Sequence, residues 1–306
     1  HSEGEVKTPR FGGVLVWLVP PFMALVFFLL SHSGLGWFEK LSFLSRNQTW
    51  LPLGTLLAAS AVGFLDDLLQ VITVSGNSAF ARIWKKANTY IAGGLELKHR
   101  LFLVSCIGLV GAWWFFTKLG IDTIHVPGVG DFSLGLLYIP LFVIVMIAVY
   151  SGGVIDGLDG LSGGTFAVIF AAFSIIAFSH GQIDLAAFCL ALVGALLAFL
   201  WHNIPPAKFY MSETGTMGLC ATLTVVAFLT DSVFVLPIIA FPLVLESGSV
   251  IVQLLSKKIR KKKVLLAAPI HHHFEALGWP HYQVTMRFWI IGIVMAVIGV
   301  AIRLLG

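Results

Sequence analysis

Acidic and histidine side chains recur in four short polar segments of this chain, each next to a long apolar run. The four are Asp66-Asp67, Asp156-Gly-Leu-Asp159, Glu213, and His271-His272-His273 with Glu275. Neighbouring carboxylates such as Asp66 and Asp67 repel one another unless a proton or a cation compensates them. Oxygen ligands of this kind suit Mg²⁺, which usually takes one or two carboxylates together with substrate phosphates. These segments therefore predict a site that binds a divalent cation or transfers protons.

The three consecutive histidines predict a different role. Successive side chains point in different directions on any regular element, so a single zinc ion bound by His271, His272 and His273 is disfavoured. Their ring nitrogens fit better as hydrogen-bonding groups for a phosphate or diphosphate. The alternative is that each polar segment is only a solvated helix end. That interpretation would serve for any one segment, but it explains four of them poorly, because ionisable residues at membrane depth usually mark functional sites.

The elements that position these residues must lie in a membrane. Of the 306 residues, 58% are hydrophobic and only 11% are charged, and the mean hydropathy is +0.94. Soluble domains have about 25% charged residues. The composition therefore excludes a water-soluble enzyme, a disordered chain and a nucleic-acid-binding domain, so no nucleic-acid partner is expected. The three cysteines lie in apolar runs, at spacings that fit neither a disulfide framework nor a zinc site.

Nine apolar runs are candidate membrane spans. A helix needs about 20 mostly apolar residues to cross the hydrocarbon core, and the runs lack the alternation of β-barrel strands. The candidates are Phe11–Leu30, Leu51–Leu65, Leu101–Leu119, Leu134–Tyr150, Phe166–Phe178, Leu185–Trp201, the short Met217–Leu229, Val233–Leu255 and Phe288–Leu305. The sequence predicts an all-α, polytopic membrane protein with a single domain over residues 1–306.

Lysine and arginine residues are distributed unequally between alternate loops. The loops on the side of the N-terminus hold most of them, including the run Lys257–Lys263, whereas the other side holds only Lys40, Arg46, Lys118 and Arg303. The positive-inside rule places the basic side in the cytoplasm. All four polar segments fall on this side, so the predicted site faces the cytoplasm.

Longer motifs surround the polar segments and occur in a fixed order. They are Thr8-Pro9-Arg10-Phe11-Gly12-Gly13, Asp66-Asp67, Asp156-Gly-Leu-Asp159-Gly-Leu161, Asn203-Ile-Pro-Pro206, Tyr210-Met-Ser-Glu213-Thr214-Gly215 and Pro269-Ile-His271-His272-His273-Phe274-Glu275. This order resembles that of the polyprenyl-phosphate N-acetylhexosamine-1-phosphate transferases, over nearly the whole chain. The histidine motif is most similar to the branch of that family that makes lipid I. The family has ten spans, so the chain resembles a member that lacks the first.

The resemblance implies a reaction and a location. UDP-MurNAc-pentapeptide and undecaprenyl phosphate would react with Mg²⁺ as cofactor to give lipid I and UMP, a step of peptidoglycan synthesis in the cell wall. The protein would be a multi-pass protein of the bacterial inner (plasma) membrane, in contact with membrane lipid, and a homodimer is a further expected partner.

The resemblance also implies roles for single residues. Asp66 and Asp67 would hold or deprotonate the lipid phosphate, and Glu213 together with Asp67 would bind the metal. His271, His272 and His273 would contact the diphosphate and the aminosugar. The residues expected on the nucleotide and substrate side are Asp156, Asp159, Asn203, Lys7, Arg100 and Tyr210, the last as an aromatic ring that stacks on uracil.

Four features depart from the family's motifs. Ser212-Glu213 stands where the motif has Gly-Asp, Gly153 stands where it has Asn, Gln70 replaces a Lys, and Arg100 replaces another Lys after an insertion around Ser75–Gly93. Two alternatives therefore stay open. One is a transferase of GlcNAc-1-phosphate to polyprenyl phosphate, to which the Thr8-Pro9-Arg10 opening is more similar. The other is a non-catalytic membrane protein that binds polyprenyl phosphate.

Overall fold

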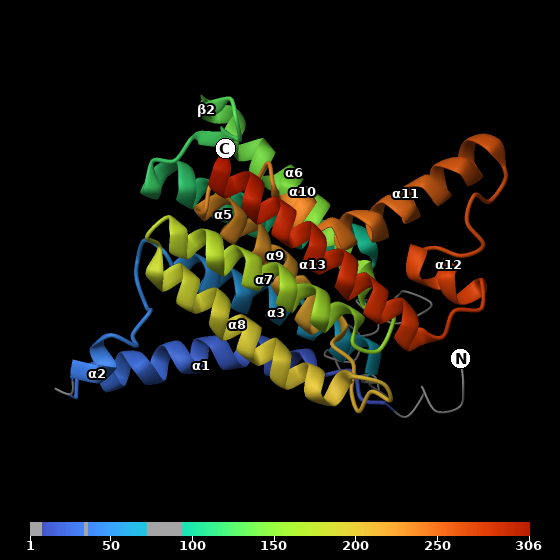
Figure 1. Ribbon diagram of the computed structural model, residues 1–306, viewed down its shortest axis with the longest axis horizontal. Coiled ribbons are helices and arrows are strands. Elements are labelled where there is room, and N and C mark those ends of the chain that lie inside the picture. Colours follow the sequence, from blue (N-terminus) through green and yellow to red (C-terminus); the bar gives the residue numbers. More distant parts are fainter. Residues whose placement is uncertain (1–7, 34–35, 72–93) are drawn as a thin grey trace, which may run out of the picture.

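The computed structural model describes residues 8–33, 36–71 and 94–306. These residues form long α-helices and one short β-hairpin (Figure 1). The helices are α1 (Gly13–Ser31), α2 (Gly36–Glu39), α3 (Trp50–Val71), α5 (Leu97–Trp114), α6 (Tyr138–Ser151), α7 (Leu161–Ser179), α8 (Ile183–Asn203), α9 (Ser212–Leu229), α10 (Leu236–Ile239), α11 (Phe241–Arg260), α12 (Ile270–Ala276) and α13 (His281–Leu305). Eight helices in the described residues are long and apolar enough to cross a membrane, which confirms the predicted all-α polytopic class.

Helix α9 lies at the centre of the bundle. Of its most apolar stretch 89% is buried inside the protein, compared with 22% for α1 and for α13. The outer helices expose large apolar side chains such as Phe22, Ile290 and Val297. Such surfaces are expected where helices face lipid. The N-terminal end of α9, which carries Glu213, is therefore surrounded by other helices.

Small residues allow α3 to pack closely against α9. A Cβ atom added at Gly63 of α3 would lie 2.2 Å from the backbone carbonyl oxygen of Glu213, and one added at Gly218 of α9 would lie 1.9 Å from Ser60 Oγ. Any larger residue at position 63 would thus meet backbone that cannot move aside, so glycine is needed for this close approach. The contact brings the end of α3, with Asp66 and Asp67, beside the first turn of α9.

The predicted span Val233–Leu255 is not one continuous helix. It is divided at Ala240 into α10 and α11, and each of these helices has a proline at its start. Proline lacks a backbone N–H, so it can begin a helix but not continue one. Helix α11 buries Glu246 and Gln253 and exposes Ile251 and Leu254. Figure 1 shows α11 leaving the bundle toward α12.

The described residues also form a β-hairpin, which the all-α prediction did not include. It lies at the end of the bundle opposite to Asp66 and Asp67. Strands β1 (Thr123–Val126) and β2 (Gly130–Ser133) are antiparallel, with Thr123 opposite Ser133 and Val126 opposite Gly130. The hairpin lies beside the C-terminal end of α13 (Figure 1), where Gly128 N–H donates to the Gly306 carbonyl.

Candidate active site

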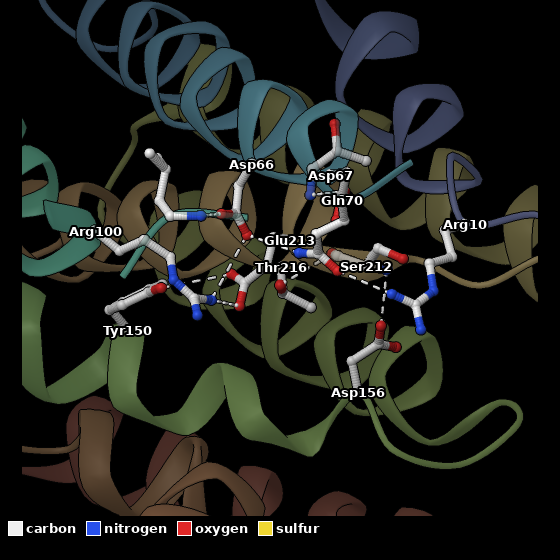
Figure 2. Close-up of polar contacts among 12 residues, drawn as sticks. Arg10, Asp66, Asp67, Gln70, Arg100, Tyr150, Asp156, Ser212, Glu213 and Thr216 are labelled. Carbon is white, nitrogen blue, oxygen red and sulfur yellow. Dashed lines mark hydrogen bonds and ion pairs between the residues drawn. The ribbon is translucent and has the colours of Figure 1, made fainter. Parts of the chain in front are cut away.

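Carboxylates from separate segments of the chain meet at the first turn of α9 (Figure 2). Asp67 Oδ2 accepts a 2.8 Å hydrogen bond from the backbone N–H of Thr214, and Asp156 Oδ2 accepts a 2.8 Å bond from that of Ser212. The first N–H groups of a helix have no partner within the helix, and they favour nearby negative charge. Two predicted functional carboxylates therefore cap α9, which fixes both of them beside Glu213.

Arg100 connects Asp66 with Glu213. Its Nη1 lies 2.5 Å from Glu213 Oε1 and 3.7 Å from Asp66 Oδ2. Gln70 Nε2 also donates to Asp66 Oδ2 over 3.1 Å, and the Tyr150 hydroxyl donates to Glu213 Oε2 over 3.5 Å. Residues that the sequence assigned to the lipid phosphate, the substrate and the metal thus form one network (Figure 2).

This network has an excess of negative charge. Asp66 and Asp67 are 0% and 1% exposed, and Glu213 adds a third carboxylate, whereas Arg100 is a cation that contacts Asp66 and Glu213. When all four are ionised, two negative charges stay uncompensated. A divalent cation would balance this charge, and burial makes the balance more important because it weakens screening by solvent.

The donor atoms fit Mg²⁺ in their chemistry. They are all carboxylate oxygens, and Mg²⁺ needs only one or two of these when phosphates supply further ligands. Asp67 and Glu213 are the pair that would hold it. The part of the chain that the structure describes contains one group of three ligand atoms within 4.8 Å of one another, His125, Asp131 and Asp231, and it lies at the other end of the bundle. Among the described residues, the carboxylates near α9 do not form such a group, so phosphate oxygens of a substrate would have to supply further ligands.

Asp156 lies between α6 and α7 and is half-buried. Burial raises the pKa of its carboxyl, and hydrogen bonds from the Ser162 hydroxyl and the Ser212 N–H partly oppose this rise. The folded protein therefore favours the protonated form of Asp156 more than the unfolded chain does, and the stability that this gives declines as the pH rises through the raised pKa.

The side chains of Asp159 and Asn203 form hydrogen bonds with backbone groups of neighbouring loops. Asp159 Oδ2 accepts from the Ala207 N–H over 3.0 Å. Asn203, which is 2% exposed, accepts from the Gly160 N–H over 2.9 Å and donates to the Phe209 carbonyl over 2.7 Å. In this structure both side chains hold the segment between α8 and α9 against the start of α7.

The segment that leads to α9 also contacts the start of the chain. The Tyr210 N–H donates to the Pro9 carbonyl, and its own carbonyl accepts from the Gly12 N–H, both over 2.9 Å. The predicted substrate residue Lys7 lies outside the described residues. Arg10, which the sequence analysis did not assign to the site, donates to Gln70 Oε1 over 2.9 Å (Figure 2).

The three histidines of α12 have three different partners, as their spacing predicts. His271 is buried, and its Nδ1 lies 2.8 Å from Glu246 Oε2. His272 Nδ1 lies 2.5 Å from Glu275 Oε2. His273 Nδ1 accepts a backbone N–H from the segment before α12. His271 reaches the loop of Asp156, since a Cβ atom at Gly157 would lie 2.3 Å from His271 Nε2.

Glu246 is a residue that the sequence analysis missed. It is fully buried on α11, and among the described residues neither its Oε1 nor His271 Nε2 has a hydrogen-bond partner. An ionisable residue inside a predicted span is a signal that could have found it. The pair links α11 to α12 and orients the His271 ring toward Gly157.

We expect Glu246→Ala to lower the free energy of unfolding by about 1–3 kcal/mol, because it leaves the buried His271 ring without its partner. Glu246→Gln keeps an acceptor and should cost less than half as much. Thermal unfolding of the purified variants measures both values. Equal losses for the two variants would show that the His271 hydrogen bond contributes nothing.

Ser212 adopts a left-handed backbone conformation, with a φ of 57°. Residues other than glycine are disfavoured there by about 1 kcal/mol, and the similar family motif has glycine at this position. Ser212→Gly should therefore raise the free energy of unfolding by about 0.5–1 kcal/mol. Ser247→Gly, in the interior of α11, is the matched control and should lower it. An unchanged or lower stability for Ser212→Gly would contradict this account.

Comparison with known proteins agrees with this geometry. The model of glycosyl transferase family 4 matches residues 49–231, more than half of the chain, and the matched region includes Asp66, Asp67, Asp156 and Glu213. The chain belongs to glycosyl transferase family 4. The matched residues include α3 and α9, whose close packing forms the carboxylate cluster. Helices α11 and α12 come after the matched residues.

Curated relatives named phospho-N-acetylmuramoyl-pentapeptide-transferase are similar over nearly the whole chain. A relative from a Geobacillus species is 32% identical over 302 residues, which are 98% of this chain and 85% of the relative. The relative from Lactiplantibacillus plantarum is 34% identical with the same coverage. The relative from Shouchella clausii is 37% identical over 96% of this chain and 83% of its own length. These similarities confirm the family resemblance noted from the motifs.

Proposed function

We propose that this chain transfers phospho-N-acetylmuramoyl-pentapeptide from its UDP-sugar to undecaprenyl phosphate, giving lipid I and UMP in peptidoglycan synthesis. The names of the similar proteins support this activity. The observation that carries the proposal is the meeting of Asp66, Asp67, Asp156 and Glu213 at one helix end within the family match.

In the proposed reaction, an oxygen of the lipid phosphate attacks the β-phosphorus of the UDP-sugar, and the bond from that phosphorus to the UMP oxygen breaks. Such a transfer depends on positioning and charge compensation more than on covalent catalysis. Asp66 and Asp67 would orient the lipid phosphate and accept a proton that it carries. Arg100 and the partly exposed His272 would donate hydrogen bonds to the diphosphate.

Mg²⁺ is the proposed cofactor, with Asp67 and Glu213 as its protein ligands. When bound, the ion would compensate the charge of the diphosphate and stabilise the departing UMP. The bond from Thr214 N–H to Oδ2 holds the Asp67 side chain beside the first turn of α9, where Glu213 lies.

The nucleotide is proposed to lie toward Asp156, Asp159 and Tyr210. Tyr210 would stack on uracil, and the hydrogen bonds of Asn203 hold the segment in which Tyr210 lies. The histidines of α12 would contact the diphosphate and the aminosugar from the other side. His271 would do so from the position that Glu246 gives it.

The proposed location is the plasma membrane of a bacterium, with the site facing the cytoplasm. The basic residues of α11 and the following segment support this orientation. Single cysteines at Lys261 and at Asp131 should be labelled by an impermeant reagent from opposite faces of the membrane. Labelling of both positions from the same face would contradict the proposed topology.

The activity is tested with the purified chain and radiolabelled sugar nucleotides. UDP-MurNAc-pentapeptide with undecaprenyl phosphate and Mg²⁺ should give a labelled lipid that is absent after chelation of the metal. A parallel reaction with UDP-GlcNAc distinguishes the two transferase hypotheses. If labelled lipid forms with UDP-GlcNAc but not with UDP-MurNAc-pentapeptide, the proposed sugar nucleotide is wrong. Binding of the lipid without any product would favour the non-catalytic alternative.

A further inference from the structure

Arg100 occupies a position that is unfavourable for a cation on its own. It lies near the N-terminal end of α5, where the helix dipole favours negative charge. Its side chain is only 20% exposed, and among the described residues its Nε has no hydrogen-bond partner. The cost of placing a guanidinium here must be offset by the carboxylates that it contacts.

The contacts of Arg100 are those of a bridging cation. Its Nη1 lies between an oxygen of Glu213 on α9 and an oxygen of Asp66 on α3, at 2.5 Å and 3.7 Å (Figure 2). The other Glu213 oxygen accepts from the Tyr150 hydroxyl. Both oxygens of the proposed metal ligand are therefore engaged by the protein itself.

We propose that Arg100 is an internal counter-cation that competes with the divalent ion for Glu213. This inference rests on the proposed function, because it assumes that Glu213 is a metal ligand. Two cations that both contact Glu213 Oε1 would repel one another, which makes simultaneous contact unfavourable in a partly buried site. Binding of the divalent ion therefore displaces the guanidinium from Glu213. A displaced arginine keeps its charge and can pair with the substrate's diphosphate, for which its planar group is well suited.

One neighbouring residue and one conservative variant of Arg100 supply matched comparisons. Lys98 lies on the same helix, is paired with Glu96 and is 73% exposed. Lys98→Gln therefore removes the same charge as Arg100→Gln, without removing a contact to Asp66 or Glu213. Arg100→Lys keeps the charge but replaces the branched group with one ammonium, which is less able to contact two carboxylates at once.

The experiment measures binding of Mn²⁺, a spectroscopic substitute for Mg²⁺, to the purified full chain in detergent. Free Mn²⁺ is followed by electron paramagnetic resonance, so the readout does not depend on activity. Arg100→Gln should tighten Mn²⁺ binding at least about tenfold relative to wild type, because it removes a like charge at contact distance. Arg100→Lys should tighten it by a smaller factor, and Lys98→Gln should change it less than about twofold, because its charge is exposed and screened.

Glu213→Gln distinguishes failure of the inference from failure of the proposed metal site. If Glu213→Gln binds Mn²⁺ as wild type does, Glu213 is not a ligand and the proposed site itself is wrong. If Glu213→Gln loses Mn²⁺ but Arg100→Gln binds it no tighter than wild type, the competition is overturned. If Arg100→Gln does not fold, Arg100→Lys decides in the same way, since an unchanged Mn²⁺ affinity for that variant would also overturn the competition.

Discussion

Glu213→Gln should reduce transferase activity by more than about 100-fold, whereas Glu213→Asp should retain or raise it. An amide cannot supply the negative charge that a cation ligand needs. Glutamine would also replace the anionic partner of Arg100 with a neutral one. The aspartate variant keeps the charge and shortens the side chain by one bond, about 1.5 Å.

The structure gives the aspartate variant a further expected property. The long side chain of Glu213 is what reaches Arg100 and Tyr150. A shorter side chain would withdraw the carboxylate toward the end of α9, where Asp67 is bonded to Thr214. Activity of the aspartate variant should therefore saturate at a lower Mg²⁺ concentration than that of wild type.

Activity measured against Mg²⁺ concentration for wild type and both variants tests these expectations together. Stability of each variant, measured by thermal unfolding, serves as the control for folding. Three coincident activity curves would exclude Glu213 from the metal site and would favour the non-catalytic hypothesis or another ligand.

Asp67→Asn should lower turnover by at least about 100-fold while leaving the protein folded. Its amide oxygen can still accept the hydrogen bond from Thr214 N–H, so this contact with the first turn of α9 is kept while the charge is lost. Asp66→Asn is a less clean variant. Both Asp66 oxygens already accept hydrogen bonds, from Leu95 N–H and from Gln70, and an amide can accept at only one of its two positions.

Turnover of Asp67→Asn is best compared with that of Asp184→Asn. Asp184 lies in the first turn of α8, at the opposite end of that helix from Asn203. The substitution Asp184→Asn therefore removes an equal charge far from the site. Asp184→Asn should keep the wild-type rate. If folded Asp67→Asn turned over at the wild-type rate, Asp67 would be neither a metal ligand nor a proton acceptor in the reaction.

The sequence predicted which segments meet, but not how their side chains pair. Apolar runs located the helices, because a membrane span needs a long apolar stretch. The positive-inside pattern then brought Asp66, Asp156, Glu213 and His271 to one side. The pairing of Arg100 with Glu213 could not be predicted, since the two residues are 113 positions apart and their contact depends on how α5 and α9 pack.

The division between α10 and α11 was missed for a related reason. Average hydropathy over Val233–Leu255 is high enough for a span, and it does not reveal that Glu246 and Gln253 share one face. A helix that buries a polar face and exposes an apolar one is recognised from the position of its residues around the axis. The prolines at 237 and 242 were the available signal for the break.

The close packing of α3 on α9 at Gly63 has a consequence for genetic experiments. In a deep mutational scan scored by cell growth, position 63 should tolerate almost no substitution, although glycine has no side chain that could take part in chemistry. A methyl group at position 63 would meet the backbone of Glu213 itself. Intolerance at this glycine would therefore report on the spacing of the carboxylates, and alanine, normally the mildest replacement, should be damaging there.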